Sequence, residues 1–147
     1  MFLTTRVRYG IRALIEIGIN YNKQPVLLKV ISKNQDLSLK YLDHIFTRLR
    51  TRGIIRKIKA KKGGYLLTKS PKEITLYDII EALEGIGNIE CLEDSRICPR
   101  TNHCGARVVW NRLNVKIIGV LKSITLEDFI KEHKKINKTK KSTGFSI

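Results

Sequence analysis

The most constraining feature of this chain is a pair of short amphipathic segments followed at once by a glycine turn between two β-prone runs. The segment SLKYLDHIFTRLRTRG places apolar residues every three or four positions, with Ser38 as a helix N-cap and Gly53 as a stop. A shorter helix is predicted just before it, over residues 27–35. Two short helices joined by a tight turn are typical of a helix-turn-helix.

The runs IIRKIKA (54–60) and YLLTKS (65–70) flank the turn KKGG and predict a β-hairpin. Lysine occupies four of the six positions 57–62, so the tip of this hairpin is cationic. One alternative is a small α/β fold whose lysines only keep a hairpin edge from aggregating. A helix-turn-helix followed by a basic hairpin favours a winged helix, whose second helix enters the major groove while the wing reaches phosphates or the minor groove.

The charge is unevenly distributed along the chain, which carries a formal net charge of +16. Residues 1–72 contain seventeen Lys and Arg against three acidic residues, whereas residues 73–95 contain seven acidic residues and no Lys or Arg. A basic module indicates a polyanionic partner, because each neutralised phosphate releases counterions. Nucleic acid is the favoured partner, and a merely solubilising surface is the alternative.

Three further helices are predicted, over about residues 4–21, 70–85 and 105–122. The acidic helix 70–85 is expected to lie behind the DNA-reading surface and to support it. The last helix carries a long apolar seam, for which a second copy of the chain is the simplest partner and the first helix an alternative. The residues assigned to the dimer are Val109, Leu113, Ile117, Val120 and Leu121.

The predicted fold is therefore mainly α with a small β-hairpin wing: a winged helix-turn-helix DNA-binding domain joined to a long C-terminal dimerisation helix. We expect the DNA-binding domain to span 1–85 and a cysteine-containing loop to span 86–104. The dimerisation helix and the segment after it span 105–130, and the basic tail 131–147 is predicted to be disordered.

All three cysteines lie in that loop with the spacing C-x6-C-x5-C. Paired C-x2-C elements are missing, and three thiolates leave a tetrahedral zinc ion one ligand short unless His103 completes it. Widely spaced cysteines suit an iron-sulfur cluster better, and redox-active thiols are a third possibility. An odd cysteine count with no apolar leader or membrane-length run predicts a cytoplasmic protein without a membrane segment.

An enzyme is the main alternative from another class. The sequence has no nucleotide-binding glycine loop, and His44, His103 and His133 show no spacing with carboxylates that is typical of a triad or a metalloprotease. A non-specific architectural DNA binder would explain the charge but would leave the cysteine loop without a role. We therefore expect no enzymatic activity and no small-molecule substrate.

An ordered set of motifs carries a resemblance to a known family. The segments LTTRVRYGIRAL, LSLKYLDHIFTRLRTRGII and KKGGYLL, then the cysteine spacing and VVWNRLNVKIIGVLKSITLEDF, resemble the winged-helix regulators that include IscR, NsrR and CymR. The similarity runs from residue 1 to about residue 130. It implies a homodimeric DNA-binding regulator, usually a repressor, that acts on a palindromic operator in double-stranded DNA.

The resemblance also implies roles for individual residues. In many of these regulators three cysteines hold an iron-sulfur cluster whose state alters promoter affinity, which makes Cys91, Cys98 and Cys104 the ligands here, with 2Fe-2S favoured over 4Fe-4S. Lys59 stands where related wings often carry an arginine for the minor groove. The DNA contacts assigned are Ser38, Lys40, Tyr41, Asp43, Lys59, Lys61 and Lys62.

Two departures from the family pattern leave the fourth ligand unassigned. Arg107 stands where the IscR branch has a histidine, and Arg8 where the NsrR branch has an acidic residue that reaches across the dimer. An open or labile position would suit a sensor, with the loop expected beside the dimer helix and near the DNA-reading surface. The same fold could instead act as a thiol-redox or partner-protein-controlled repressor without a cluster. The candidate fourth ligands are His103, Glu90, Glu93, Asp94 and an external ligand.

Overall fold

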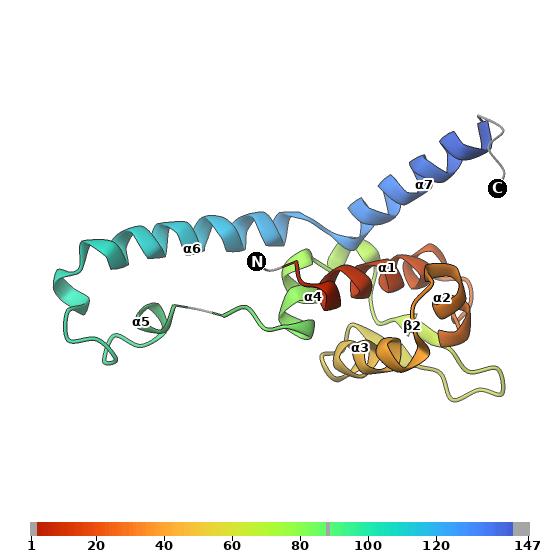
Figure 1. Ribbon diagram of the computed structural model, residues 1–147, viewed down its shortest axis with the longest axis horizontal. Coiled ribbons are helices and arrows are strands. Elements are labelled where there is room, and N and C mark those ends of the chain that lie inside the picture. Colours follow the sequence, from red (N-terminus) through yellow and green to blue (C-terminus); the bar gives the residue numbers. More distant parts are fainter. Residues whose placement is uncertain (1–2, 88, 143–147) are drawn as a thin grey trace.

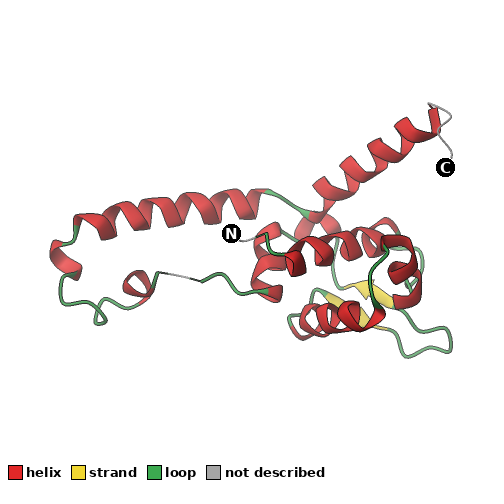
Figure 2. Cartoon of the chain, viewed as in Figure 1, coloured by secondary structure: helices red, strands yellow, loops and turns green. Residues whose placement is uncertain are grey.

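The computed structural model describes residues 3–87 and 89–142 of the chain. Within them it is mostly helical, with one two-stranded antiparallel hairpin, as predicted (Figures 1 and 2). The elements in chain order are α1 (Thr5–Ile19), α2 (Leu28–Gln35), α3 (Leu39–Thr51), β1 (Ile55–Lys57), β2 (Tyr65–Leu67), the 3-10 turn η1 (Pro71–Glu73), α4 (Leu76–Leu83), α5 (Glu90–Glu93), the 3-10 turn η2 (Thr101–His103), α6 (Gly105–Ser123) and α7 (Leu126–Ser142).

Helices α1 to α4 and the hairpin pack around one apolar core, and we call this unit the reading head (Figure 1). Helix α3 begins where the sequence predicts, because the Ser38 hydroxyl accepts a hydrogen bond from the Tyr41 amide at 3.1 Å. Its inner face is fully buried, and the Phe46 ring meets Tyr65 of β2 edge to face with centroids 4.8 Å apart. The core therefore fixes the second helix of the helix-turn-helix against the base of the wing.

The hairpin is shorter than the two sequence runs that predict it. Each strand has three residues, paired from Ile55 with Leu67 to Lys57 with Tyr65. Beyond them the chain forms a loop with Gly63 and Gly64 at φ of 63° and 108°. A Cβ on Gly64 would lie 2.8 Å from the Pro25 Cβ, so only glycine lets the wing pass this close to the segment before α2.

The predicted helix over 70–85 is divided in two. Residues 71–73 form η1, Ile74 is extended, and α4 begins only at Leu76. The reason is a capping box in which the Thr75 hydroxyl and the Asp78 carboxylate each accept a hydrogen bond from the other residue's amide, at 3.1 Å and 2.9 Å. A helix start at Thr75 leaves the backbone of Ile74 free to pair elsewhere.

That backbone pairs with a second copy of the same motif. The sequence ITLYD at 74–78 recurs as ITLED at 124–128, where α7 begins. The Leu76 amide donates to the Ile124 carbonyl and the Leu126 amide donates to the Ile74 carbonyl, both at 2.8 Å. The two helix starts thus hold each other antiparallel and attach the C-terminal helices to the reading head.

Helix α6 matches its predicted range closely but extends away from the reading head (Figure 1). Among the described residues it packs chiefly against α4 and α5, while α1 packs against α7. The main packing of this helix within the protomer is thus on α4, and not on α1 as the sequence alternative had it. Leu121 is buried in the protomer's own core, whereas the rest of the seam is more exposed.

The segment from residue 131, for which the sequence predicts disorder, continues as helix α7 to Ser142, and residues 143–147 lie outside the described residues. The physical reason is docking of the first turns. Leu126 and Ile130 are buried. A Cβ added to Gly18 of α1 would lie only 2.5 Å from Ile130 Cδ1, so the absence of a side chain at Gly18 lets α7 pack closely on α1. Once these turns are fixed, lysine-rich residues of good helix propensity propagate the helix.

No helix in the described ranges is long and apolar enough to cross a bilayer.

Candidate functional site

The outer face of α3 carries the residues predicted to read DNA. Lys40 and Asp43 are exposed, as are Thr47 and Arg50 further along the helix. Ser38 and Tyr41 have structural contacts as well: Ser38 caps the helix, and Tyr41 is half-buried with its ring 6.0 Å from Tyr9 of α1. Of the four contacts predicted on this helix, Lys40 and Asp43 therefore have side chains that make neither a cap nor a ring contact with other described residues. The DNA-binding roles of all four residues stay predictions.

Three elements converge beside this face. Lys29 of α2, Asp43 of α3 and Lys57 of β1 line one shallow hollow of about 380 Å³. Lys61 and Lys62 line a second hollow of about 530 Å³ between the wing loop and the start of α2. Helix α2 and the wing thus present cations beside the outer face of α3, where phosphate contacts would position the helix on the duplex.

The wing provides the first testable contact. Lys59 is exposed in the loop between β1 and β2, so Lys59→Ala is expected to weaken binding to duplex DNA and to lower the slope of log affinity against log salt by about 0.9. Lys134→Ala is the matched control, since Lys134 is an exposed lysine on α7, away from the wing. Salt titration by fluorescence anisotropy measures both; equal slopes for Lys59→Ala and wild type would remove Lys59 from the contact surface.

The three cysteines occupy three different local structures. Cys91 lies in α5, Cys98 lies in the turn before η2, and Cys104 is the N-cap of α6. All three are free thiols of intermediate burial. Over residues 3–87 and 89–142 no group of three or more His, Cys, Asp or Glu side chains is gathered closely enough to hold a metal ion. The thiols therefore share a loop without forming an assembled site.

Arg107 connects two of the cysteine segments. Its amide donates to the Cys104 sulfur at 3.4 Å, and its Nε donates to the Cys91 carbonyl at 3.0 Å. The Cys104 sulfur thus accepts a main-chain hydrogen bond at the first turn of α6. The residue that replaces the histidine of the IscR branch thus holds the first and last cysteine segments together through a main-chain contact.

The four candidates for a fourth ligand differ in availability. Asp94 is engaged by Arg96, whose guanidinium and amide both donate to its carboxylate at 2.9 Å. The side-chain hydrogen bond from Arg96, followed by the backbone one, lowers the pKa of Asp94 below its usual value. Glu90 and Glu93 are exposed in α5 and His103 is exposed in η2. Asp94 would have to leave Arg96 to bind a metal.

The donor chemistry of the loop fits an iron-sulfur cluster. Three free thiols of intermediate burial, one of them at a helix N-terminus, are the ligand type that such clusters take. The loop must bring these thiols closer together to share one group, because no such cluster of side chains is formed by the described residues.

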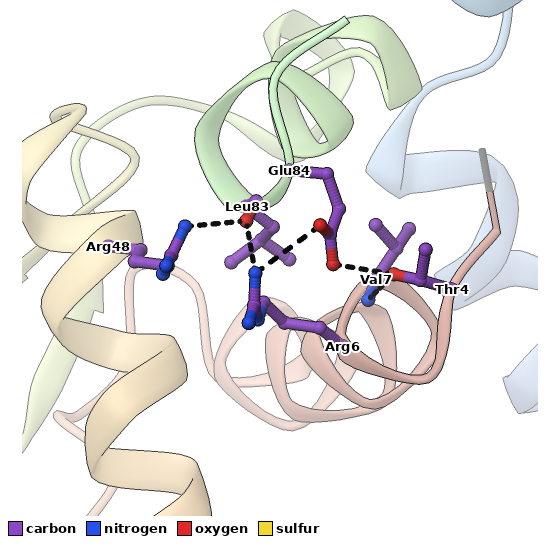
Figure 3. A network of polar contacts seen from close by, with 6 residues as sticks. All are labelled: Thr4, Arg6, Val7, Arg48, Leu83 and Glu84. Carbon is purple, nitrogen blue, oxygen red and sulfur yellow. Dashed lines mark hydrogen bonds and ion pairs between the residues drawn. The ribbon is translucent and has the colours of Figure 1, made fainter.

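A contact network that sequence reasoning missed lies where α4 ends and the chain turns toward the cysteines (Figure 3). Arg6 of α1 and Arg48 of α3 both donate from Nη1 to the Leu83 carbonyl, at 3.2 Å and 3.0 Å. Arg6 also pairs with Glu84 at 3.3 Å, and the Thr4 hydroxyl donates to the same carboxylate at 2.7 Å. No periodicity or motif marks these residues, because their shared partner is a main-chain carbonyl.

The chain is similar in sequence and fold to known regulators. Residues 3–132 match the Rrf2 family, described as iron-dependent transcriptional regulator. The chain belongs to the Rrf2 family. Among curated Rrf2 relatives, protein rrf2 of Nitratidesulfovibrio vulgaris is 35% identical over 133 residues, covering 90% of this chain and 89% of the relative. The regulator IscR of Photorhabdus laumondii is 32% identical over 130 residues, covering 88% and 79%.

Solved Rrf2-type structures agree with this membership. IscR of T. potens superposes with a TM-score of 0.69 at 31% identity, covering 90% of this chain and 88% of that one. CymR, the global cysteine regulator of B. subtilis, superposes with a TM-score of 0.69 at 35% identity, covering 88% and 95%. The protein is a DNA-binding transcriptional regulator of the IscR and CymR type and not an enzyme.

Proposed function

We propose that this Rrf2 protein is a homodimeric, cytoplasmic repressor whose affinity for a palindromic operator is set by an iron-sulfur cluster on Cys91, Cys98 and Cys104. The observation that carries the proposal is the combination of a winged reading head with one loop that holds all three free cysteines. The family description as iron-dependent and the IscR relatives support the same reading.

A second copy of the chain is the partner that fits the exposed side of α6. Val109, Leu113 and Val120 are spaced by four and seven residues, so they lie on one stripe of the helix. Their exposed fractions are 50%, 49% and 58%, high for apolar side chains on a helix that leaves the core. Ile117 is half-buried beside the stripe. Leu121 already packs in its own protomer, which argues against a place for it in the dimer.

Dimerisation would also determine which reading head lies beside the cysteine loop. Within one protomer the loop lies at the far end of α6 from α3, and not near its own reading head as the sequence suggested (Figure 1). The helix is about 28 Å long at about 1.5 Å per residue. A two-fold pairing of antiparallel α6 helices would carry each loop toward the partner's reading head. The state of the loop would then affect the spacing of the two recognition helices.

In this mechanism the lysines of the wing and the recognition helix bind phosphates, while the α3 faces enter successive major grooves. The cluster supplies a group that oxygen or nitric oxide can alter, and the cysteines hold it in the loop. A change in head spacing worth about 1–3 kcal/mol would alter operator affinity by roughly 5- to 150-fold.

A second candidate function uses the same dimer without a cluster. The three thiols are free and of intermediate burial, and the Cys104 sulfur accepts a hydrogen bond from the Arg107 amide. Oxidation of these thiols to a disulfide or sulfenic acid, or binding of a partner protein, would then control repression.

Anaerobic purification followed by iron and acid-labile sulfide analysis tests the proposal. We expect near-stoichiometric iron and sulfide, with charge-transfer bands in the visible spectrum. Colourless, metal-free protein after reconstitution with iron and sulfide would contradict the cluster and leave thiol or partner control as the account.

A further inference from the structure

We infer that Arg6 and Arg48 are positioning residues that couple the cysteine loop to the recognition helix by holding the carbonyl of Leu83. The inference rests on the proposed function, since it explains how the same loop acts on the same α3. It is drawn from the network in Figure 3, where α1, α3 and the end of α4 meet.

The first step is the main-chain contact. Leu83 is the last residue of α4, and the terminal carbonyls of a helix have no partner within that helix. Two guanidinium groups from two different helices satisfy this one carbonyl, at 3.2 Å from Arg6 and 3.0 Å from Arg48. Charge-assisted hydrogen bonds of this type are stronger than neutral ones. The end of α4 is therefore tied directly to the helix that reads DNA.

The second step is the side chain of the same residue. Leu83 is fully buried, and its Cδ1 lies 2.5 Å from where a Cβ on Gly10 of α1 would be. Glycine at this position thus forms a notch in α1 that receives the leucine. Leu83 is held at its side chain by α1 and at its carbonyl by both arginines, so it cannot shift without moving α1 or α3.

Within the described ranges, the arrangement leaves one buried nitrogen atom of Arg6 without a hydrogen bond. The Arg6 Nε is buried, and no hydrogen-bond partner for it exists among the residues that the structure describes. A buried donor without a partner lowers stability, and such groups in a native protein call for an explanation. An apolar contact between α1 and α4 would avoid this penalty. A function for the guanidinium in binding Leu83 and Glu84 would explain why an arginine stands here despite this loss of stability.

A short segment of chain connects Leu83 to the first cysteine. Gly85 follows the C-cap of α4 with φ of 75°, and the Ile86 amide donates to the Glu81 carboxylate at 2.9 Å. Cys91 follows Leu83 by eight residues. A rearrangement that gathers the thiols therefore pulls on a segment that α4 itself holds at Ile86, and that α1 and α3 hold at Glu84 and Leu83. The arginines transmit that pull to α3 at Arg48, on its half-buried side, while Arg50 of the same helix faces solvent.

The test compares Arg48→Ala with Arg50→Ala. The probe is the duplex that the wild-type protein selects from a random-sequence pool, and each variant is measured loaded anaerobically with iron and sulfide and again after chelation. The readout is the ratio of the two affinities. We expect Arg48→Ala to reduce this ratio by about threefold or more with an unchanged salt slope, because its guanidinium points inward. Arg50→Ala should weaken both states equally and leave the ratio intact.

A conservative variant separates positioning from folding. Arg48→Lys keeps the charge and a donor, so an intermediate ratio is expected, with circular dichroism and thermal unfolding used to select folded variants. If folded Arg48→Ala or, should that variant not fold, Arg48→Lys switches by the full wild-type ratio, the coupling role of Arg48 is refuted. If the wild-type protein itself shows equal affinities in the two states, the proposed control by the cysteines fails, which is a different result from the refutation of the role of Arg48.

Discussion

Leu113→Glu is expected to convert the dimer into monomers and to lower operator affinity by roughly a hundredfold or more. Leu113 lies at the centre of the exposed stripe on α6, and a carboxylate there would be buried without a partner in the pairing of two helices. A monomer can engage only one half-site, and joining two binding modules commonly raises affinity by about 10²- to 10⁴-fold. Sedimentation velocity and operator titration measure the two effects.

The matched control for this change is Val115→Glu. Val115 is 62% exposed on the same helix but lies on the opposite side from the stripe, so the same charge is added away from the proposed contact. We expect it to remain dimeric. A dimeric Leu113→Glu protein, or dissociation by Val115→Glu alone, would place the interface elsewhere.

Cys98→Ala is expected to leave the fold intact and to abolish both iron binding and any response of operator affinity to iron removal. The side chain has intermediate burial, and the contact that orders its turn is made by the Cys98 carbonyl, which accepts from the Thr101 hydroxyl at 2.7 Å and persists in alanine. The loss should be complete, because two thiolates cannot replace three in holding the cluster. Iron analysis and operator titration check it.

Ser95→Ala serves as the control within the same loop, since Ser95 also contributes its carbonyl to Thr101, at 2.9 Å. It should retain iron and switching. Loss of the native circular dichroism in Cys98→Ala would make this cysteine structural instead. Retained iron at the wild-type level would remove it from the ligand set.

The reading head was predictable because its signals are local. The cap at Ser38 and the apolar spacing through Leu49 act within a few residues and formed as expected, whereas the KKGG turn formed inside a longer loop over 58–64 between two shorter strands. The division of 70–85 also had a readable signal, the Thr75 and Asp78 capping box, but the Ser-Pro start at residue 70 competed with it. At the start of α7 only half of this box forms: the Asp128 carboxylate accepts from the Thr125 amide at 2.8 Å, while the Thr125 hydroxyl also donates to that carboxylate, at 3.2 Å.

Other features depended on contacts that no local pattern carries. The course of α7 depends on Ile130 meeting Gly18 more than a hundred residues earlier, which overrides its lysine-rich composition. In the cysteine loop the spacing identifies the thiols, but not that Arg107 bridges two of their segments or that Asp94 is paired with Arg96. The hold of Arg6 and Arg48 on Leu83 likewise arises only when three helices meet.

The most direct measurement is the affinity of the wild-type protein for its selected operator duplex before and after removal of iron, beside a random duplex of equal length. We expect sequence-specific binding by a dimer, with a change in operator affinity of about fivefold or more between the two states. Equal affinities in both states, from protein shown to have gained and then lost iron, would contradict the central claim.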